Sequence, residues 1–244
     1  MQRRGFTRRI LTLAVAVSAI ASSIGSPALA QATGRFLQDL PEPPPLVATY
    51  FRSDLTGTDI FQPGTCPTGR AGGGNVEEGF QVYVQGRCVD QHNAAYITVR
   101  GQEIGVGDGE VSIEFKVLSG ADRAVINLFV RVQGVTYNAA YLSFASDEVT
   151  LFKRERSGVS IVGTQIGLGE IDPQNWNRLG LRFVGAETWL LLNDVPLLYG
   201  NDTLNQEYGG IGLQVERAGS PDDEDEVAIV FRDLALSGFV APSE

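Results

Sequence analysis

The sequence predicts an all-β protein: an antiparallel two-sheet jelly-roll sandwich that follows an N-terminal signal peptide. Short apolar segments recur through the last two thirds of the chain, and turn-forming residues separate them. Several of these segments alternate apolar with polar residues, which is the pattern of a strand with one buried face. No convincing helical stretch follows the first thirty residues. Together these observations favour a sandwich over any mixed or helical fold.

The expected strands follow from this alternation and from the turn residues between the segments. In chain order they are 47–51, 80–85, 96–99, 111–117, 124–132, 137–144, 149–154, 159–166, 176–183, 189–192, 195–198, 209–215 and 227–236. We expect the first strand to pair with the last, because the termini of sandwiches often meet. The stretch from Ser53 to Asn75 is predicted to be a long Gly- and Thr-rich excursion, and Asn193-Asp194 a tight turn.

Residues 1–30 have the composition of a secretory signal peptide. Four arginines precede a largely apolar run, and Ala28-Leu29-Ala30 supplies the small-x-small cleavage signature. The run is too short for a stable membrane anchor, so we expect a periplasmic or extracellular protein whose mature chain does not insert into the membrane. Thr7-Arg8-Arg9 leaves twin-arginine export open beside general secretion.

Two further segments complete the predicted organisation. Residues 31–45 form a Pro-rich tether that ends in Pro41-Glu42-Pro43-Pro44-Pro45, and residues 46–244 form a single sandwich domain. Without the leader the chain carries 15 basic and 29 acidic residues, a formal charge of −14. This acidity argues against nucleic acid or an anionic membrane as a partner.

Cys66 and Cys88 are the only cysteines, and both lie in the exported part. An even count in a secreted chain predicts a disulfide. The bond would close a loop of 23 residues and would stabilise the fold by about 3 kcal/mol, mostly through the unfolded state.

The last third of the chain carries a family resemblance. Trp176 opens a strand, Gly209-Gly210-Ile211-Gly212 begins another, and Phe231-Arg232-Asp233-Leu234 lies in the closing strand. This order resembles the concanavalin A-like lectin/glucanase superfamily, in particular laminin G-like and 3-keto-disaccharide hydrolase-like domains. Asn193-Asp194 departs from the usual Asn-Gly pair. The resemblance implies a sandwich with two customary glycan sites, on the concave face of one sheet or on the rim loops.

Strand parity predicts which side chains meet a ligand, because alternate residues face opposite sides of a sheet. The even positions 126–132 are apolar and should face the core, which turns the odd positions outward. The same argument on the neighbouring strands gives one outer face with aromatic rings and planar donors, suited to stacking on and hydrogen bonding to a sugar. Its predicted ligand-binding residues are Asn127, Phe129, Arg131, Tyr141, Phe152, Arg154 and Arg182.

Two expectations accompany this predicted face. Replacing Tyr141 and Arg131 with Ala should abolish binding without unfolding the protein. The alternative is that the aromatic side chains only pack beneath long loops that cross the face.

Catalytic patterns are weak in this chain. Glu170-Ile171-Asp172-Pro173-Gln174-Asn175 invites comparison with the Glu-x-Asp-x-x-Glu motif of family 16 glucanases, but Asn175 replaces the general acid. We predict a loop there, since Pro173 would disrupt a central strand. His92 is the only histidine, so neither a multi-histidine metal site nor a strong charge relay can be built.

The acidic run Asp222-Asp223-Glu224-Asp225-Glu226 leaves structural calcium open, without a ligand-spacing pattern. Asp54 and Asp59 are equally ambiguous. No other cofactor is expected.

The leading hypothesis is an exported, non-catalytic glycan-binding or adhesion module that recognises a glycan or a cell-envelope component. One alternative is a glycoside hydrolase-like enzyme acting on a disaccharide or a β-glucan, for which no convincing carboxylate pair is visible. A second alternative is a structural protein of the cell envelope.

Overall fold

The computed structural model describes residues 40–46, 48–56, 61–63, 71–85, 94–99, 107–169, 171–201, 209–219 and 225–238, with the backbone alone at 50, 61–63 and 94–99. The predicted signal peptide, both cysteines and His92 lie outside these residues, as do Asp59, Glu170 and most of the acidic run. The expectations for those parts of the chain stay predictions.

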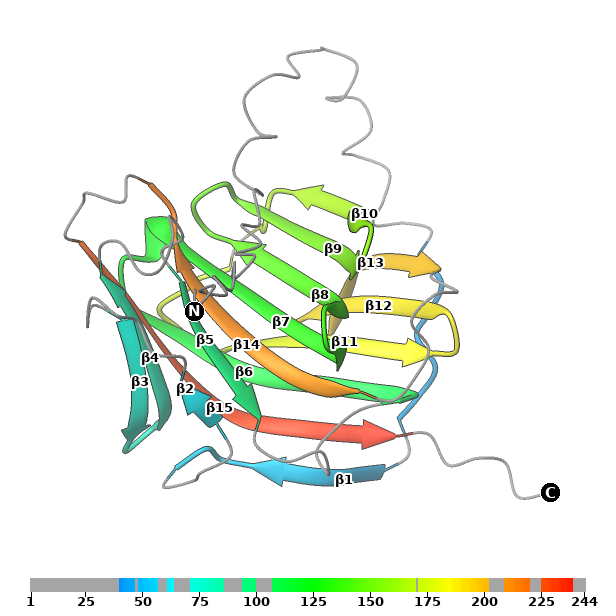
Figure 1. The fold of residues 1–244 in the computed structure, drawn as a ribbon, viewed down its shortest axis with the longest axis horizontal. Helices are drawn as coiled ribbons and strands as arrows, with labels where there is room; N and C mark the ends of the chain where they lie inside the picture. The colour runs from blue at the N-terminus through cyan, green and yellow to red at the C-terminus, as the bar shows by residue number, and fades with distance from the viewer. Residues whose placement is uncertain are drawn as a thin grey trace, which may run out of the picture.

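The described strands form two antiparallel sheets, which confirms the predicted sandwich (Figure 1). Sheet A contains, in spatial order, β13 (Val195–Asn201), β12 (Glu187–Leu192), β11 (Asn177–Val184), β6 (Gly109–Ser119), β15 (Glu226–Gly238), β4 (Gly79–Gln85) and β3 (Ala71–Val76), and β1 (Ala48–Ser53) pairs with β15. Sheet B contains β10 (Gly158–Ile166), β9 (Glu148–Glu155), β8 (Thr136–Ser143), β7 (Ala124–Gln133), β14 (Gly210–Arg217), β5 (Ala94–Val99) and β2 (Phe61–Pro63). The one described helical turn is a 3₁₀ turn at Ala121–Arg123.

The core lies between the inner faces of the two sheets, as the alternation predicts. Val111, Ile113 and Phe115 of β6 are fully buried, and so are Ile126, Leu128 and Val130 of β7 on the opposite sheet. In a strand with period-two alternation, such residues all point to one side. Parity therefore identified the core positions of both sheets from the sequence.

β15 joins segments from the two ends of the described chain. It pairs with β6 along one edge, and with β4 and then β1 along the other. The predicted pairing of the first strand with the last is confirmed, with Thr49 opposite Ser237. In Figure 1 the blue β1 and the red β15 lie side by side at the bottom of the molecule.

The Gly-rich stretch is partly strand, where the sequence predicted an excursion. Gly72, Gly73 and Gly74 pair with β4 in regular register. A Cβ on Gly73 would lie 2.7 Å from the ring of Phe80, and one on Gly72 3.0 Å from the hydroxyl of Tyr83. The glycines therefore let two aromatic rings of β4 pack directly on the backbone of β3, which compensates for the missing side chains.

The two sheets approach closely where β13 meets β10. A Cβ on Gly200 of β13 would lie 2.0 Å from Cγ1 of Val162 on β10, closer than any real contact. At this edge a glycine is required because the backbone of one sheet contacts side chains of the other.

The Asn193-Asp194 turn is confirmed, and its backbone explains the residue types. Asn193 and Asp194 have φ of 52° and 64°, the left-handed conformation that a two-residue type I′ hairpin requires and that Asn and Asp tolerate. Within the described residues, no helix is long and apolar enough to cross a membrane.

Candidate functional site

The outer face of sheet B, the side away from the core, carries five of the seven predicted site residues. They are Asn127 and Phe129 on β7, Tyr141 on β8, and Phe152 and Arg154 on β9. The strand register places Asn127 opposite Tyr141, and Tyr141 opposite Thr150. Parity therefore placed these side chains on one face.

Arg131 is a correction to the predicted face. The register of β7 shifts between Val130 and Gln133, and Arg131 adopts a left-handed φ of 52°. A bulge changes the facing of the residues beyond it, so parity fails there. The Arg131 side chain is 1% exposed, and Val132, expected in the core, is partly exposed.

The buried guanidinium of Arg131 has structural partners. It donates to the carbonyl oxygens of Gly107 and Gly185 and to Oδ1 of Asp108, at 3.0–3.3 Å. It also lies 4.5 Å from the centroid of the Phe183 ring. These contacts connect β7 with the ends of β6 and β11 and leave Arg131 no access to a ligand on the outer face.

Arg182 is the second correction. It points away from the core as parity predicts, but its strand, β11, belongs to sheet A. It donates to Oε2 of Glu110 at 2.6 and 2.8 Å and to the carbonyl of Pro44 at 2.8 Å. Parity assigns the inner and outer sides of a strand but does not say to which sheet the strand belongs.

A polar row crosses four strands on the outer face of sheet B. Thr150, Tyr141, Asn127 and Gln214 occupy directly paired positions on β9, β8, β7 and β14. The Asn127 side-chain amide donates to Oε1 of Glu216 at 2.8 Å, and the hydroxyls of Thr150 and Thr164 lie 3.0 Å apart. Amide, hydroxyl and phenol groups thus follow one another across the sheet. Asn127, Thr150 and Gln214 are buried, at 2%, 7% and 6% exposure, so Asn127 points outward as predicted but is not exposed to a ligand.

Glu216 of β14 has the largest described pKa shift on this face. Burial of its carboxyl group raises the pKa to about 7, while the Asn127 hydrogen bond acts in the opposite direction. Burial also raises the pKa of the Tyr141 phenol, and the charges of Glu148 and Glu216 add to that rise. The carboxyl of Glu216 is therefore protonated in a large fraction of molecules at neutral pH.

Next to the polar row lies an aromatic cluster, formed by Phe129, Tyr137 and Phe152. The centroids of Phe129 and Tyr137 are 4.9 Å apart, and those of Tyr137 and Phe152 are 6.2 Å apart, both edge to face. Ala139 lies between Phe129 and Phe152 in the register, and its small side chain leaves room for the rings to meet. All three rings keep part of their surface exposed.

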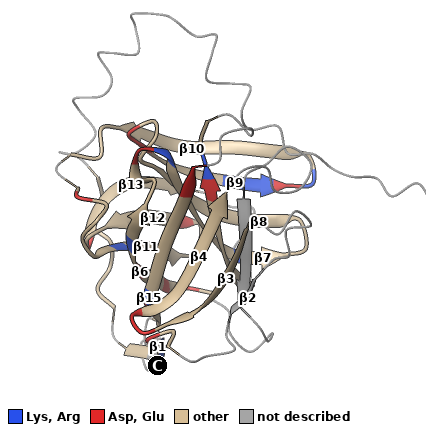
Figure 2. Ribbon diagram, turned by 90° about the vertical axis from the view of Figure 1, so that its left-hand side faces the viewer, with Lys and Arg blue, Asp and Glu red and all other residues tan. Residues whose placement is uncertain are grey.

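Arg154 lies at the end of the face nearest the β9–β10 hairpin. It lines a shallow hollow of about 520 Å³ together with Gln133, Thr136 and Arg156. Among the described residues no partner holds the Arg154 guanidinium. Figure 2 shows the charged end of β9 at this hairpin.

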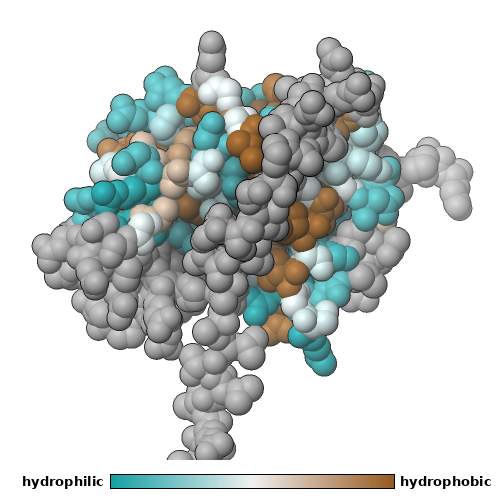
Figure 3. Space-filling model, turned by 90° about the horizontal axis from the view of Figure 1, so that it is seen from above, coloured by the Kyte–Doolittle hydropathy of each residue, from teal (hydrophilic) through white to brown (hydrophobic). Residues whose placement is uncertain are grey.

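The β10 edge beside these residues is partly apolar. Val159, Ile161 and Ile166 are 44%, 64% and 59% exposed, and Ile161 is paired with Phe152 of the aromatic cluster. Figure 3 views the molecule from the side on which β10 lies in Figure 1 and shows hydrophobic residues among polar ones. The aromatic cluster therefore continues into exposed aliphatic surface.

The segment from Ile171 to Trp176 is a loop, as the sequence predicted. Oδ1 of Asp172 accepts from the backbone of Gln174, Oδ2 accepts from the side chain of Asn175, and the Pro173 carbonyl accepts from Val117. The part of the chain that the structure describes contains no group of three metal-ligating side chains. Asp225, at the end of the acidic run, forms an ion pair of 2.7 Å with Arg123.

Three residues of this face were absent from the predicted set. Tyr137 has the same parity as Tyr141, and Gln214 and Glu216 alternate with the core residues Ile211, Leu213 and Val215. Strand parity over residues 209–215 could have predicted that the Gln214 side chain points away from the core. Only the sheet order shows that β14 lies beside β7.

The structure resembles solved concanavalin A-like jelly rolls. The carbohydrate-binding module CBM66 from Bacillus subtilis matches with a TM-score of 0.55 and 16% identity, over 75% of this chain and 98% of that chain. An endo-1,3-β-glucanase (laminarinase) catalytic domain from Thermotoga petrophila matches with a TM-score of 0.58 and 9% identity, over 80% and 98%. A β-glucanase from Bacillus licheniformis gives 0.55 and 10%, over 78% and 98%.

No family model and no curated protein matches the sequence. The protein has the concanavalin A-like jelly-roll fold that the resemblance implied. At these identities the comparison establishes the fold alone.

Proposed function

We propose that this protein is an exported, non-catalytic glycan-binding module that uses the outer face of sheet B. The observation that carries the proposal is the aromatic cluster beside Arg154, which has no partner among the described residues. Aromatic rings stack on the C–H faces of sugars, and a guanidinium donates to hydroxyl or carboxylate oxygens. From the adjacent polar row, Tyr141 adds a partly exposed phenol group, whereas the other three residues of the row are buried.

Two features favour glycan recognition by this face over an adhesion role that would use only the exposed apolar residues of β10. The polar row and the aromatic cluster share β7, β8 and β9, and Tyr141 is the one residue of the row that keeps part of its surface exposed. One ligand can therefore contact Tyr141 and the aromatic rings. The similar solved structures include a carbohydrate-binding module and glucanases. This agrees with the proposed ligand class without assigning a particular sugar.

A glycoside hydrolase-like activity is the second candidate, favoured by one observation. A carboxyl group with a pKa of about 7, such as that of Glu216, suits a general acid. Hydrolysis with two carboxylates needs a partner about 5–10 Å away. The register places Glu148 three strands from Glu216, along the row that runs through Val125 and Ser143. At normal strand spacing their Cα atoms lie about 14 Å apart, and their side chains do not converge because side chains stand perpendicular to a sheet. This pair therefore fits neither two-carboxylate mechanism.

The decisive measurement is binding of the chain to a broad glycan array that includes β-1,3-glucan and mixed-linkage β-glucan, with calcium and again with a chelator. We expect selective binding, and we expect Tyr137→Ala and Phe152→Ala each to weaken it about tenfold because they remove stacking surface. Loss of binding with chelator would place a metal ion in the site.

Tyr83→Ala is the matched control, because Tyr83 is a half-buried aromatic residue of β4 in sheet A. It should leave binding unchanged. Equal losses in all three variants would contradict the assignment to sheet B. Release of reducing sugar from a bound β-glucan, abolished by Glu216→Gln, would establish the enzyme. An array with no selective hit, together with partners that co-purify from native envelopes, would favour the structural envelope protein.

A further inference from the structure

The outer face of sheet A carries a second candidate site, unrelated to the proposed glycan face. Trp189 and Leu191 of β12 point away from the core, since Leu190 and Leu192 belong to it. Both are nevertheless as buried as core residues, at 2% and 4% exposure. An outward-facing Trp in a solvated sheet is normally exposed. Something must therefore cover this face.

The cover is the proline-rich segment 41–45, which the sequence predicted to be part of a tether. The indole Nε1 of Trp189 donates to the carbonyl of Pro41 at 2.8 Å, and Nη1 of Arg182 donates to the carbonyl of Pro44 at 2.8 Å. In Figure 1 the blue segment that leads into β1 passes the ends of β12 and β13. The described part of the predicted tether thus lies against the domain.

The spacing of the two acceptors fits one backbone conformation. Leu40, Glu42, Pro43 and Pro44 each precede a proline, which restricts them to extended or polyproline II geometry, and the prolines fix their own φ. Polyproline II has three residues per turn, so the carbonyls of residues 41 and 44 point in the same direction. The segment has no internal backbone hydrogen bonds to satisfy those carbonyls, and the sheet supplies the donors.

The donors form part of one row across the outer face of sheet A. Tyr199, Trp189, Arg182 and Glu110 occupy directly paired positions on β13, β12, β11 and β6. The rings of Trp189 and Tyr199 lie 5.2 Å apart, and the Tyr199 hydroxyl donates to Glu187 at 2.7 Å. Glu110, 4% exposed, fixes the Arg182 guanidinium with two hydrogen bonds. Each donor is thus oriented by a second residue.

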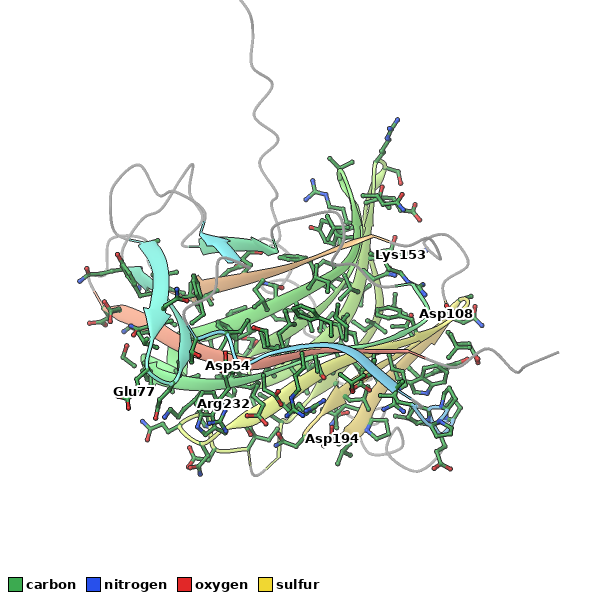
Figure 4. The ribbon with its side chains drawn as sticks, turned by 90° about the horizontal axis from the view of Figure 1, so that it is seen from below. Asp54, Glu77, Asp108, Lys153, Asp194 and Arg232 are labelled. Carbon is green, nitrogen blue, oxygen red and sulfur yellow. The ribbon has the colours of Figure 1, made fainter. Side chains whose placement is uncertain are left out.

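We propose that this row is a binding site for polyproline II peptides, and that its ligand is segment 41–45 of the same chain. Aromatic grooves with an indole donor are a recurring way to recognise such peptides, because the ligand loses little entropy on binding. Between the segment and the sheet a hollow of about 390 Å³ remains, lined by Leu191, Asp194 and Pro196 among others. Figure 4 shows Asp194 on the same side of the molecule as Arg232, on the outer side of sheet A.

The two tryptophans of the chain make the proposal testable by indole N–H exchange in the ¹⁵N-labelled protein. We expect Trp189 to exchange slowly in the full chain. Replacing Pro43, Pro44 and Pro45 with Gly should accelerate its exchange about tenfold, the effect of one lost hydrogen bond. Trp176 is the internal control, because its ring contacts Arg232 and Lys116 instead, and its exchange should not change.

Addition of the peptide Leu-Pro-Glu-Pro-Pro-Pro-Leu to the triple-glycine variant separates a binding site from simple packing. We expect this peptide to restore slow exchange at Trp189, and a peptide with Gly in place of Pro to have no effect. Failure to restore protection would overturn the binding-site proposal. Equal exchange at Trp189 in the native chain and the variant would overturn the docking itself. A concentration-dependent dimer lost in Arg182→Lys would assign the segment to a second copy and overturn the intramolecular ligand.

Discussion

The guanidinium of Arg131 illustrates, at the scale of a single residue, how an expected surface donor becomes part of the structure. Its bulged backbone turns the side chain toward the carbonyls of Gly107 and Gly185 and toward the Phe183 ring. Both carbonyls belong to partly buried residues, and the guanidinium that donates to them is itself buried.

We therefore expect Arg131→Ala to reduce the free energy of unfolding by about 3 kcal/mol, since it removes a buried side chain, opens a cavity and breaks the hydrogen bonds to partly buried carbonyls. Urea unfolding of the purified variant measures this. Arg154→Ala is the matched control and should change stability by less than about 0.5 kcal/mol. This corrects the expectation that removing Arg131 spares the fold, and equal stability of the two variants would contradict the structural role.

The raised pKa of the Glu216 carboxyl group predicts that the free energy of unfolding depends on pH. Its pKa is raised in the folded state from 4.5 to about 7, so between these values the folded chain binds more protons than the unfolded chain. Its contribution to stability is complete below pH 4.5, falls as the pH rises toward 7, and is constant above it, a change of about 3 kcal/mol.

Chemical unfolding between pH 4 and 8 checks this prediction. Glu216→Gln should remove most of the slope in that window. Asn127→Ala should extend the window to higher pH, because the hydrogen bond that lowers the pKa of Glu216 is lost. A wild-type slope that survives in Glu216→Gln would assign the titration to another group.

At the scale of elements, glycines decide where strands can approach one another. Gly200 of β13 lies against Val162 of β10, whereas a Cβ on Gly163 of β10 would meet Leu198 at an ordinary 3.6 Å. Both glycines lie in strands, so an Ala substitution changes the backbone preference similarly at both positions. A difference in stability between the two variants therefore reports side-chain packing.

We expect Gly200→Ala to destabilise the protein by about 1–3 kcal/mol through overpacking, and Gly163→Ala to be nearly neutral. Adding Val162→Ala to Gly200→Ala should recover part of the loss, because the two positions share one contact. A thermodynamic cycle from the four unfolding curves measures the coupling. If the stability changes of the two single variants simply add in the double variant, the contact between positions 200 and 162 is not the source of the loss.

At the scale of the whole molecule, β15 connects strands from distant parts of the described chain within sheet A. Its Phe231 is fully buried and lies opposite both Phe80 and Phe115 in the register. Strands from the beginning, middle and end of the described chain depend on this central strand.

Phe231→Ala should therefore reduce stability by about 3–5 kcal/mol and shift every spectroscopic transition together. Tryptophan fluorescence reports sheet A, where Trp189 lies, and far-UV circular dichroism reports both sheets. Coincident midpoints in the variant are the expected result. Separate midpoints would show that sheet B unfolds independently.

The sequence by itself determined the sandwich, the position of nearly every described strand and the core residues, because period-two alternation is a local property of each strand. It also determined that the side chains of Asn127, Phe129 and Tyr141 point away from the core. It held a signal for the covered outer face as well, since Trp189-Leu190-Leu191-Leu192 lacks the alternation of a strand exposed on one side.

Only the tertiary structure decided which strands share a sheet, and this is why Arg182 belongs to a different face from Asn127. It also decided the bulge that buries Arg131, the proximity of Glu216 to the polar row, and the docking of residues 41–45 on Trp189. Strand order, bulges and segment docking depend on contacts between residues far apart in the chain, and no local pattern of residue types encodes those contacts.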